Sequence, residues 1–337
     1  MTRRTEETLV ALTTASTPAL REPNNSWASG KSRGPRKRRG REGIAGYVFL
    51  TPWLIGLMGI TAVPMLISLY LSFTNYDVFT PFSEVEWVGW RNYKRMFTTD
   101  PSYWTSVWVT VKFALISTPL KLAAALGVAL LLNRERRGVG LFRSLFYLPS
   151  LLGGSVALAL IWVAIFSRDG AFNGFLGLFG IEGKPWVYDP SWSLETLMLL
   201  AIWQFGAPMV IFLAGLKQIP TELYEAASVD GAGRWRQFWN VTIPMLSPVI
   251  FFNLVLETIS GFQGFTAAFV LSNGTGGPVD STLMYTLNLY VKGFQDFEMG
   301  YACALAWVFL VAIGIITAIF FSTGRFWVHY TDDGNAE

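Results

Sequence analysis

The chain has 337 residues, of which 52% are hydrophobic and 15% are charged, and its formal net charge at pH 7 is +3. This apolar balance predicts a membrane protein instead of a soluble domain. Cys303 and His329 are the single cysteine and the single histidine. Their scarcity excludes an intrachain disulfide and a conventional Cys/His metal site.

Residues 1–44 form a tail in which Lys and Arg outnumber Glu. The basic excess belongs to this tail and not to a shaped surface, so it favours a disordered cytoplasmic segment near anionic lipid over a nucleic-acid partner. Gly30-Lys31-Ser32 is similar to the end of a phosphate-binding loop, but Asn25 stands where that loop needs glycine. We therefore expect no ATP, metal or other cofactor in this chain.

Six apolar stretches are each long enough to cross the membrane as a helix, which takes roughly 20 residues. They are residues 47–73, 104–132, 142–166, 194–216, 245–271 and 299–321. The first could be a signal peptide, but a long polar segment precedes it and its apolar run exceeds a signal core. The pattern predicts an all-α membrane protein with six transmembrane helices in a domain at 45–330, followed by a cytoplasmic tail at 331–337.

The distribution of Lys and Arg predicts the orientation, because basic residues near the ends of spans stay on the cytoplasmic side. They gather before the first span, between spans two and three, and in residues 217–244 between spans four and five. Fewer lie in the other connections. We expect both termini and residues 217–244 in the cytoplasm.

Three charged residues lie more than two positions inside the predicted spans, where an unpaired charge is costly. Lys112 lies near the outer end of span two, and its side chain can snorkel to the interface. Lys121 and Glu257 lie deeper. We expect these two side chains either to pair or to line a polar route through the membrane.

The stretch 245–271 is the most polar of the six. Polar groups beside phenylalanines suit a hydroxyl-rich ligand, although small and polar residues also hold membrane helices together. A different possibility is a stand-alone carrier driven by protons or sodium through Glu257. A membrane-embedded enzyme would need clustered catalytic groups, which a single histidine outside the spans does not supply.

Residues 217–244 predict two short helices that meet at Gly231. Thr221 can cap the first helix, and Gly231 is placed to end it. Small residues at Ala226 and Ala227 would let another backbone approach, which favours a projection that enters a partner's groove. The alternative is a helix pair lying on the bilayer surface, with Trp235 and Trp239 at the headgroups.

The spacing Glu225-Ala226-Ala227, then Gly231, then Ile243-Pro244 closely resembles the EAA loop of bacterial ABC importer permeases. Flanking residues such as Asp230-Gly231-Ala232 and Trp327-Val328-His329-Tyr330 resemble the carbohydrate-uptake branch, in particular the maltose and glycerol-phosphate permeases. The likeness covers about residues 47–330.

The resemblance implies a type I ABC importer fold in a bacterial cytoplasmic membrane. It also implies four kinds of partner: a second permease, two ATPase subunits that bind ATP and Mg, an extracellular sugar-binding protein, and the sugar itself, an oligosaccharide or disaccharide. The chain would be a transport subunit and no enzyme.

The resemblance also implies two sets of functional residues. The coupling set, which would dock the ATPase, is Glu225, Ala226, Ala227, Asp230, Gly231, Ala232 and Pro244. Counting from Pro244 along the next helix places the family's sugar contacts at Glu257, Ser260, Gly261 and Gly264. These residues differ from the relatives' small polar and amide residues, so Gln263, Asn253 or the second permease are alternative positions for the contacts. With Lys121 and two neighbouring amides, the substrate-pathway set is Asn253, Glu257, Ser260, Gly261, Gln263, Gly264 and Lys121.

Overall fold

The computed structural model describes residues 49–134 and 138–328, and the described residues divide into two units, one up to Ile60 and one from Thr61 on. The regular elements of the described residues are helices, beside one isolated bridge between Thr74 and Trp87. Six segments are long and apolar enough to cross a membrane: Phe49–Leu71, Pro101–Leu132, Val156–Gly177, Ser193–Gln218, Arg234–Leu271 and Met299–Gly324. The all-α class with six spans is therefore confirmed. The predicted tails at 1–44 and 331–337 lie outside the described residues.

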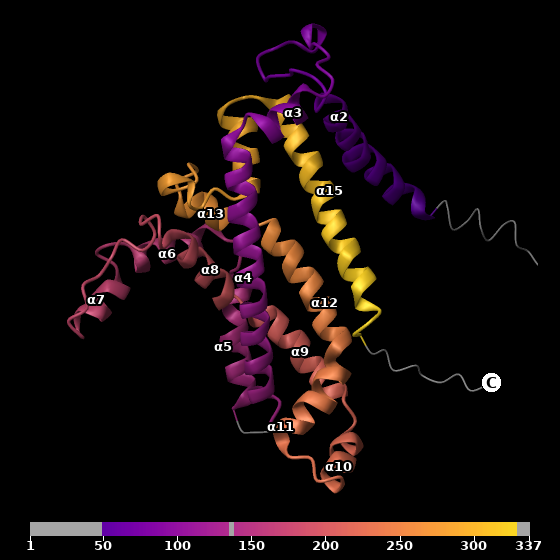
Figure 1. Cartoon of the computed structure of the whole chain (residues 1–337), viewed down its shortest axis with the longest axis vertical. Helices are drawn as coiled ribbons and strands as arrows, with labels where there is room; N and C mark the ends of the chain where they lie inside the picture. Colours follow the sequence, from indigo (N-terminus) through magenta and orange to yellow (C-terminus); the bar gives the residue numbers. More distant parts are fainter. Residues whose placement is uncertain (1–48, 135–137, 329–337) are drawn as a thin grey trace, which may run out of the picture. The chain divides into compact units, whose positions relative to one another are not determined.

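Within Thr61–Glu337, helix α4 (Pro101–Leu132) is the element around which the others pack. It contacts α8 (Ser193–Trp203), α9 (Gly206–Gln218) and α12 (Ile243–Phe262), and Figure 1 shows it running beside the latter two. One apolar cluster joins α4, α9 and α12, and a second is built from α6, α8, α13 and α14 around Leu197. The bounds of these and the remaining helices are α2 Val63–Leu71, α3 Arg91–Thr98, α5 Val139–Leu151, α6 Val156–Phe166, α7 Ala171–Gly177, α10 Thr221–Val229, α11 Arg234–Gln237, α13 Thr266–Leu271, α14 Tyr285–Tyr290 and α15 Met299–Gly324.

The third predicted span, 142–166, is not one helix. It is divided into α5 and α6 at Gly153-Gly154, where Gly154 has a left-handed φ of +77° that favours glycine. Ser155 then caps α6, because its Oγ accepts the N–H of Leu158 at 3.2 Å. A side chain at Gly153 would meet Gln204 Oε1 at 2.6 Å, so the break is also a site of close packing.

The fourth and fifth predicted spans are interrupted as well. Between α8 and α9, Ser150 Oγ donates to the carbonyl of Gln204 at 3.0 Å and accepts the N–H of Ala207 at 3.1 Å. Between α12 and α13, Thr286 Oγ1 donates to the carbonyl of Gly264 at 2.6 Å. These bonds satisfy backbone groups freed by the interruptions, as a low-polarity environment demands.

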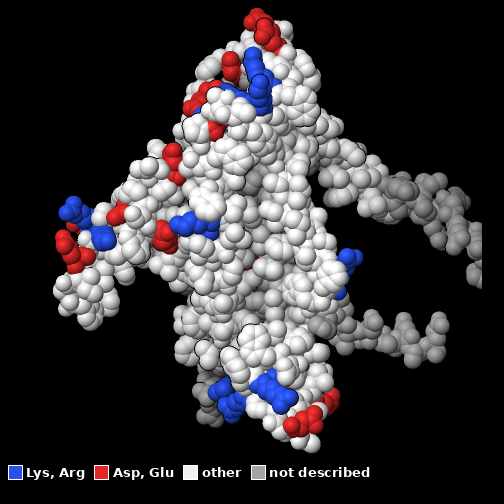
Figure 2. Space-filling model, in the orientation of Figure 1, with Lys and Arg blue, Asp and Glu red and all other residues white. Residues whose placement is uncertain are grey.

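At the α3 end, the segment after α2 lies against the first turn of α15 (Figure 1). Asn92 Nδ2 donates to the carbonyls of Ser72 and Thr74, and the N–H of Gly300 donates to the carbonyl of Tyr76 at 2.7 Å. Arg95 pairs with Glu298 at 2.9 Å, which raises the pKa of the guanidinium. On the face in Figure 2, charged side chains gather mainly near α3, α7 and α10–α11, and the surface between is largely uncharged.

Candidate functional site

A cavity of about 530 Å³ lies where the three helix interruptions meet α4. Its walls come from α4, α8 and α12, and the interruptions contribute Gly154, Gln204 and residues 263–265. Irregular backbone at membrane depth is tolerated where it is buried in protein or lines a cavity, and transporter sites are built from such broken helices. The polar side chains of the lining are Ser117, Thr118, Lys121, Gln204, Glu257, Ser260, Gln263 and Thr266.

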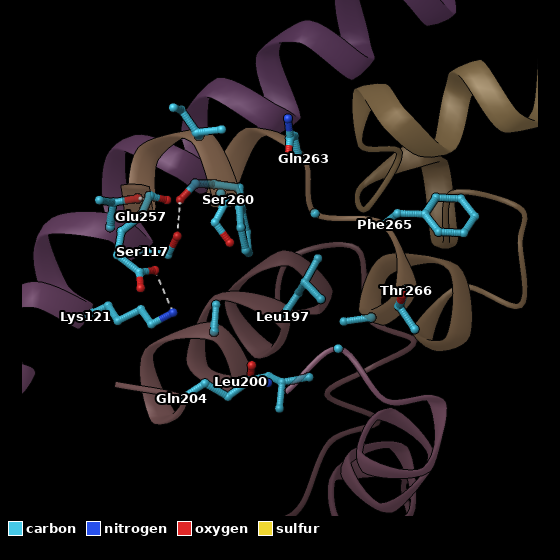
Figure 3. A pocket seen from close by; sticks show the side chains of 18 of the residues that line it. Ser117, Lys121, Leu197, Leu200, Gln204, Glu257, Ser260, Gln263, Phe265 and Thr266 are labelled. Carbon is cyan, nitrogen blue, oxygen red and sulfur yellow. Dashed lines mark hydrogen bonds and ion pairs between the residues drawn. The ribbon is translucent and has the colours of Figure 1, made fainter. Parts of the chain in front are cut away.

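Lys121 and Glu257 form an ion pair in this lining. Lys121 Nζ donates to Glu257 Oε2 at 2.7 Å, and the two side chains are 15% and 16% exposed. The pair joins α4 to α12, and Thr118 Oγ1 adds a weak hydrogen bond to the Glu257 carbonyl at 3.4 Å. Figure 3 shows the pair on one side of the cavity, with Gln204 and Leu200 across from it. The expected pairing is therefore present, and both residues line the cavity; that this cavity belongs to a route through the membrane stays a prediction.

Six residues of the predicted substrate-pathway set line the cavity, namely Lys121, Glu257, Ser260, Gly261, Gln263 and Gly264. Asn253 does not line it. It is 1% exposed, and its Nδ2 donates to the carbonyl of Val249 at 3.0 Å. Asn253 lies one turn before Glu257, where α12 packs against α4 and α9, so its amide is used inside the helix bundle.

Gly261 serves helix packing as well as the cavity. A Cβ atom there would lie 3.3 Å from Thr118 Oγ1 and 3.6 Å from the Ala114 Cβ of α4. The small residue therefore lets α12 approach α4 closely. Gly261 therefore lines the cavity and also allows close packing between α12 and α4.

The predicted coupling set lies on a second feature, which consists of α10, the turn that joins it to α11 and, for Pro244, the start of α12. α10 ends at Val229, and Gly231 follows with φ +75°. The N–H groups of Ala232 and Gly231 donate to the carbonyls of Ala227 and Ser228, which is a Schellman motif. Gly231 ends the helix as predicted, but Thr221 is the first helical residue and its side chain makes no cap.

The two short helices hold each other and expose their apolar and small side chains. Gln237 Nε2 donates to Ser228 Oγ and to the carbonyl of Ala232, and Tyr224 and Thr242 share a hydrogen bond of 3.0 Å. Glu225, Ala226, Asp230 and Gly231 are exposed, and Ala227, Ala232 and Pro244 are half-buried. The most exposed large apolar side chains are Val229 at 89% and Trp235 at 73%. These hydrogen bonds fix the two helices relative to each other, and the small and apolar side chains between Glu225 and Trp235 stay largely exposed.

Residues 121–330 match the family described as the binding-protein-dependent transport system inner membrane component. The chain belongs to this family. It is 50% identical to the probable ABC transporter permease protein YesP of Bacillus subtilis (strain 168), over 91% of this chain and 97% of that protein. It is 33% identical to the lactose transport system permease protein LacF of Rhizobium radiobacter, over 84% and 94% of the two chains.

A crystal structure of a bacterial alginate ABC transporter, in complex with a periplasmic protein bound to an alginate pentasaccharide, contains a chain of the same fold. The TM-score is 0.72 at 22% identity, with 85% of this chain and 95% of that chain covered. The predicted importer permease fold and family are thus confirmed, and the chain is a multi-pass membrane transport subunit. These relationships do not support a stand-alone ion-coupled carrier acting through Glu257.

The permease cavity contains side chains that the sequence did not single out. Ser117, Thr118 and Gln204 belong to spans two and four, in which only the two lysines of span two were singled out from the sequence. Gln204 had a visible signal, because it is a lone amide between Trp203 and Phe205 in the stretch 194–216. Ser117 carried no such signal, because a serine in a membrane helix does not by itself indicate a cavity. Membrane helices commonly satisfy serine by a bond to their own backbone, as Ser117 Oγ does by donating to the carbonyl of Phe113.

Lys112 of the permease does not simply snorkel. Its Nζ donates to Glu195 Oε1 at 2.9 Å, which joins α4 to α8, and the side chains are 38% and 39% exposed. Glu195 stands at the second residue of the predicted span 194–216 and was not recognised as an intramembrane charge. The Lys112 ammonium is therefore paired with a carboxylate of the neighbouring helix.

Proposed function

We propose that this permease is a subunit of an ATP-driven importer for a sugar, most simply an oligosaccharide or disaccharide, and that it forms half of the translocation pathway. The observation that carries the proposal is the cavity at the helix interruptions. Its amide, hydroxyl and ion-paired groups lie beside Phe265, a combination that binds hydroxyl-rich ligands. The similarity to the lactose permease LacF supports a sugar as the substrate class.

The second part of the proposal concerns energy coupling. The surface formed by Glu225, Ala226, Ala227, Asp230, Gly231 and Ala232, with Pro244 at the start of α12, would dock an ATPase subunit. Exposed small side chains on α10 allow a close approach, and the Schellman turn fixes the angle at which the chain leaves the helix. ATP and Mg would be bound by that ATPase and not by this chain, which lacks a phosphate-binding loop.

The proposed assembly contains a second permease, two ATPase subunits and an extracellular sugar-binding protein in a bacterial cytoplasmic membrane. The distribution of Lys and Arg supports cytoplasmic termini and a cytoplasmic α10–α11 pair. In this orientation the α3 end faces outward. The turn at Gly231 would then join the ATPase contact to α11, which continues into the cavity-lining α12 through the π-helical turn Phe238–Thr242.

The test is a sugar panel on the reconstituted complex, with ATP hydrolysis as the readout. We expect one class of sugar, delivered by the binding protein, to stimulate hydrolysis several-fold in the wild-type complex. Gly231→Asp and Glu225→Lys should insert normally but lose that stimulation, because each alters the docking surface. Full stimulation in both variants would contradict the docking role, and no response to any sugar would contradict the substrate class.

A further inference from the structure

The cavity lining holds two charged side chains among its described residues, Lys121 and Glu257, and these neutralise each other. The remaining groups are neutral amides, hydroxyls, apolar side chains and backbone. The carboxylate and the ammonium lie 2.7 Å apart, and each side chain is about four-fifths or more buried. The net charge that the cavity offers a ligand is therefore zero.

Such a pair has a direct consequence for the charge of the ligand. A ligand carboxylate that approaches Lys121 also approaches Glu257, and these like charges repel each other. A ligand ammonium meets the same obstacle from Lys121. A neutral polyhydroxyl ligand introduces no charge, and it can hydrogen-bond to Gln204, Ser260 or Gln263 while the ion pair stays intact.

We propose that the Lys121–Glu257 pair is the charge-selectivity filter of this permease: it restricts the cavity to uncharged saccharides, and removing either member makes the cavity select ligands of the opposite charge to the residue left behind. The inference rests on the proposed sugar-transport function and deepens it. It assigns the pair a role in specificity that packing between α4 and α12 alone does not require.

The experiment measures binding to the purified membrane complex without its binding protein, so that the binding protein does not select the ligand. The probes are glucose, glucuronate and glucosamine, which have the same ring and differ by a carboxylate or an ammonium. Saturation-transfer NMR compares the wild type with Glu257→Gln and Lys121→Gln, which keep the side-chain size nearly unchanged. The double variant Lys121→Gln/Glu257→Gln is the matched neutral control.

In the wild type and the double variant we expect glucose to bind better than either charged probe. Glu257→Gln should raise the glucuronate-to-glucose ratio by about tenfold or more, and Lys121→Gln should raise the glucosamine-to-glucose ratio similarly, because a lone buried charge strongly favours its opposite. The two variants are expected to favour ligands of opposite charge, and each gives its own test. If one variant fails to assemble, the other still tests the proposal.

Unchanged ratios, an equal loss of all three probes, or no glucuronate binding to Glu257→Gln would overturn the proposal. Failure of the proposed function has a different signature. It would appear as a wild-type complex that shows no ATP-dependent uptake of any sugar, whatever the ratios measured by NMR.

Discussion

Gly231 illustrates how one residue supports the proposed docking surface. Its φ of +75° allows the two hydrogen bonds that end α10, and a Cβ atom there would meet no other atom within 4 Å. The demand for glycine is therefore conformational and not steric. A side chain at this position acts on the backbone of the turn and, through it, on the angle between α10 and α11.

The first prediction is that Gly231→Ala destabilises the turn by roughly 1 kcal/mol, because a left-handed conformation costs an alanine about this much. We expect sugar-stimulated ATP hydrolysis by the complex to fall several-fold. Gly233→Ala is the matched control, since Gly233 lies two residues away with φ −66° and open space around its Cβ position. Equal losses in both variants would show that the left-handed turn is not what matters.

The second prediction concerns the two lysine–carboxylate pairs of α4. Lys121→Ala or Glu257→Ala should lower the free energy of unfolding by roughly 3 kcal/mol, because each leaves a largely buried charge without its partner. The double replacement should recover part of that loss. Lys112 and Glu195 are more than a third exposed, so the same cycle there should give a coupling of about 0.5 kcal/mol.

Thermal unfolding of the purified permease complex measures both cycles. Additive losses at Lys121 and Glu257 would mean that the two side chains act independently, contrary to their distance of 2.7 Å.

At the level of the elements, the interruptions of three membrane helices build the site. Two of the interruptions are held by a side chain from another part of the fold: Ser150 at the α8–α9 break and Thr286 at the α12–α13 break. The cavity is therefore supported from outside its own lining. Changes at Ser150 or Thr286 would alter its shape without removing a lining residue.

The contact between α15 and the segment after α2 gives a third prediction. A Cβ atom at Gly300 would lie 2.4 Å from the carbonyl oxygen of Thr74, which cannot move without breaking the Asn92 hydrogen bonds. Gly300→Ala should therefore lower the free energy of unfolding by about 1–3 kcal/mol, as overpacked sites do. Gly314→Ala on the same helix has open space and should stay within roughly 0.5 kcal/mol of the wild type.

Thermal unfolding of the two purified variants checks this prediction. An equal shift of the melting temperature in both variants would mean that any glycine replacement in α15 has this effect, and that the contact with Thr74 is not the cause.

Hydropathy predicted where the membrane segments lie but not where their helices break. Length and apolar content suffice for a span, whereas the break after Trp203 depends on hydrogen bonds from Ser150, which is 54 residues from Gln204 along the chain. Gly153-Gly154 did carry a local signal, because consecutive glycines commonly end helices. The polar character of span five could also be predicted from the sequence, because its polar residues stand out in an apolar stretch.

At the level of the whole molecule, the cavity combines residues whose proximity no local pattern could give. Ser117 and Gln204 belong to different spans, and Lys121 meets Glu257 across 136 residues of sequence. Asn253 is the reverse case of Ser117 and Gln204. It is a polar residue of span five that was included in the substrate-pathway set, but it lies in the packed part of the helix bundle. The turn at Gly231 was easier to predict because its signal lies within one short segment.

The most direct test of the central claim is uptake of a labelled neutral saccharide by proteoliposomes that contain the complete transporter. We predict that uptake requires ATP on the α10–α11 side and binding protein on the α3 side, and that proton and sodium ionophores leave it unchanged. Uptake that persists without ATP and collapses with an ionophore would contradict the account.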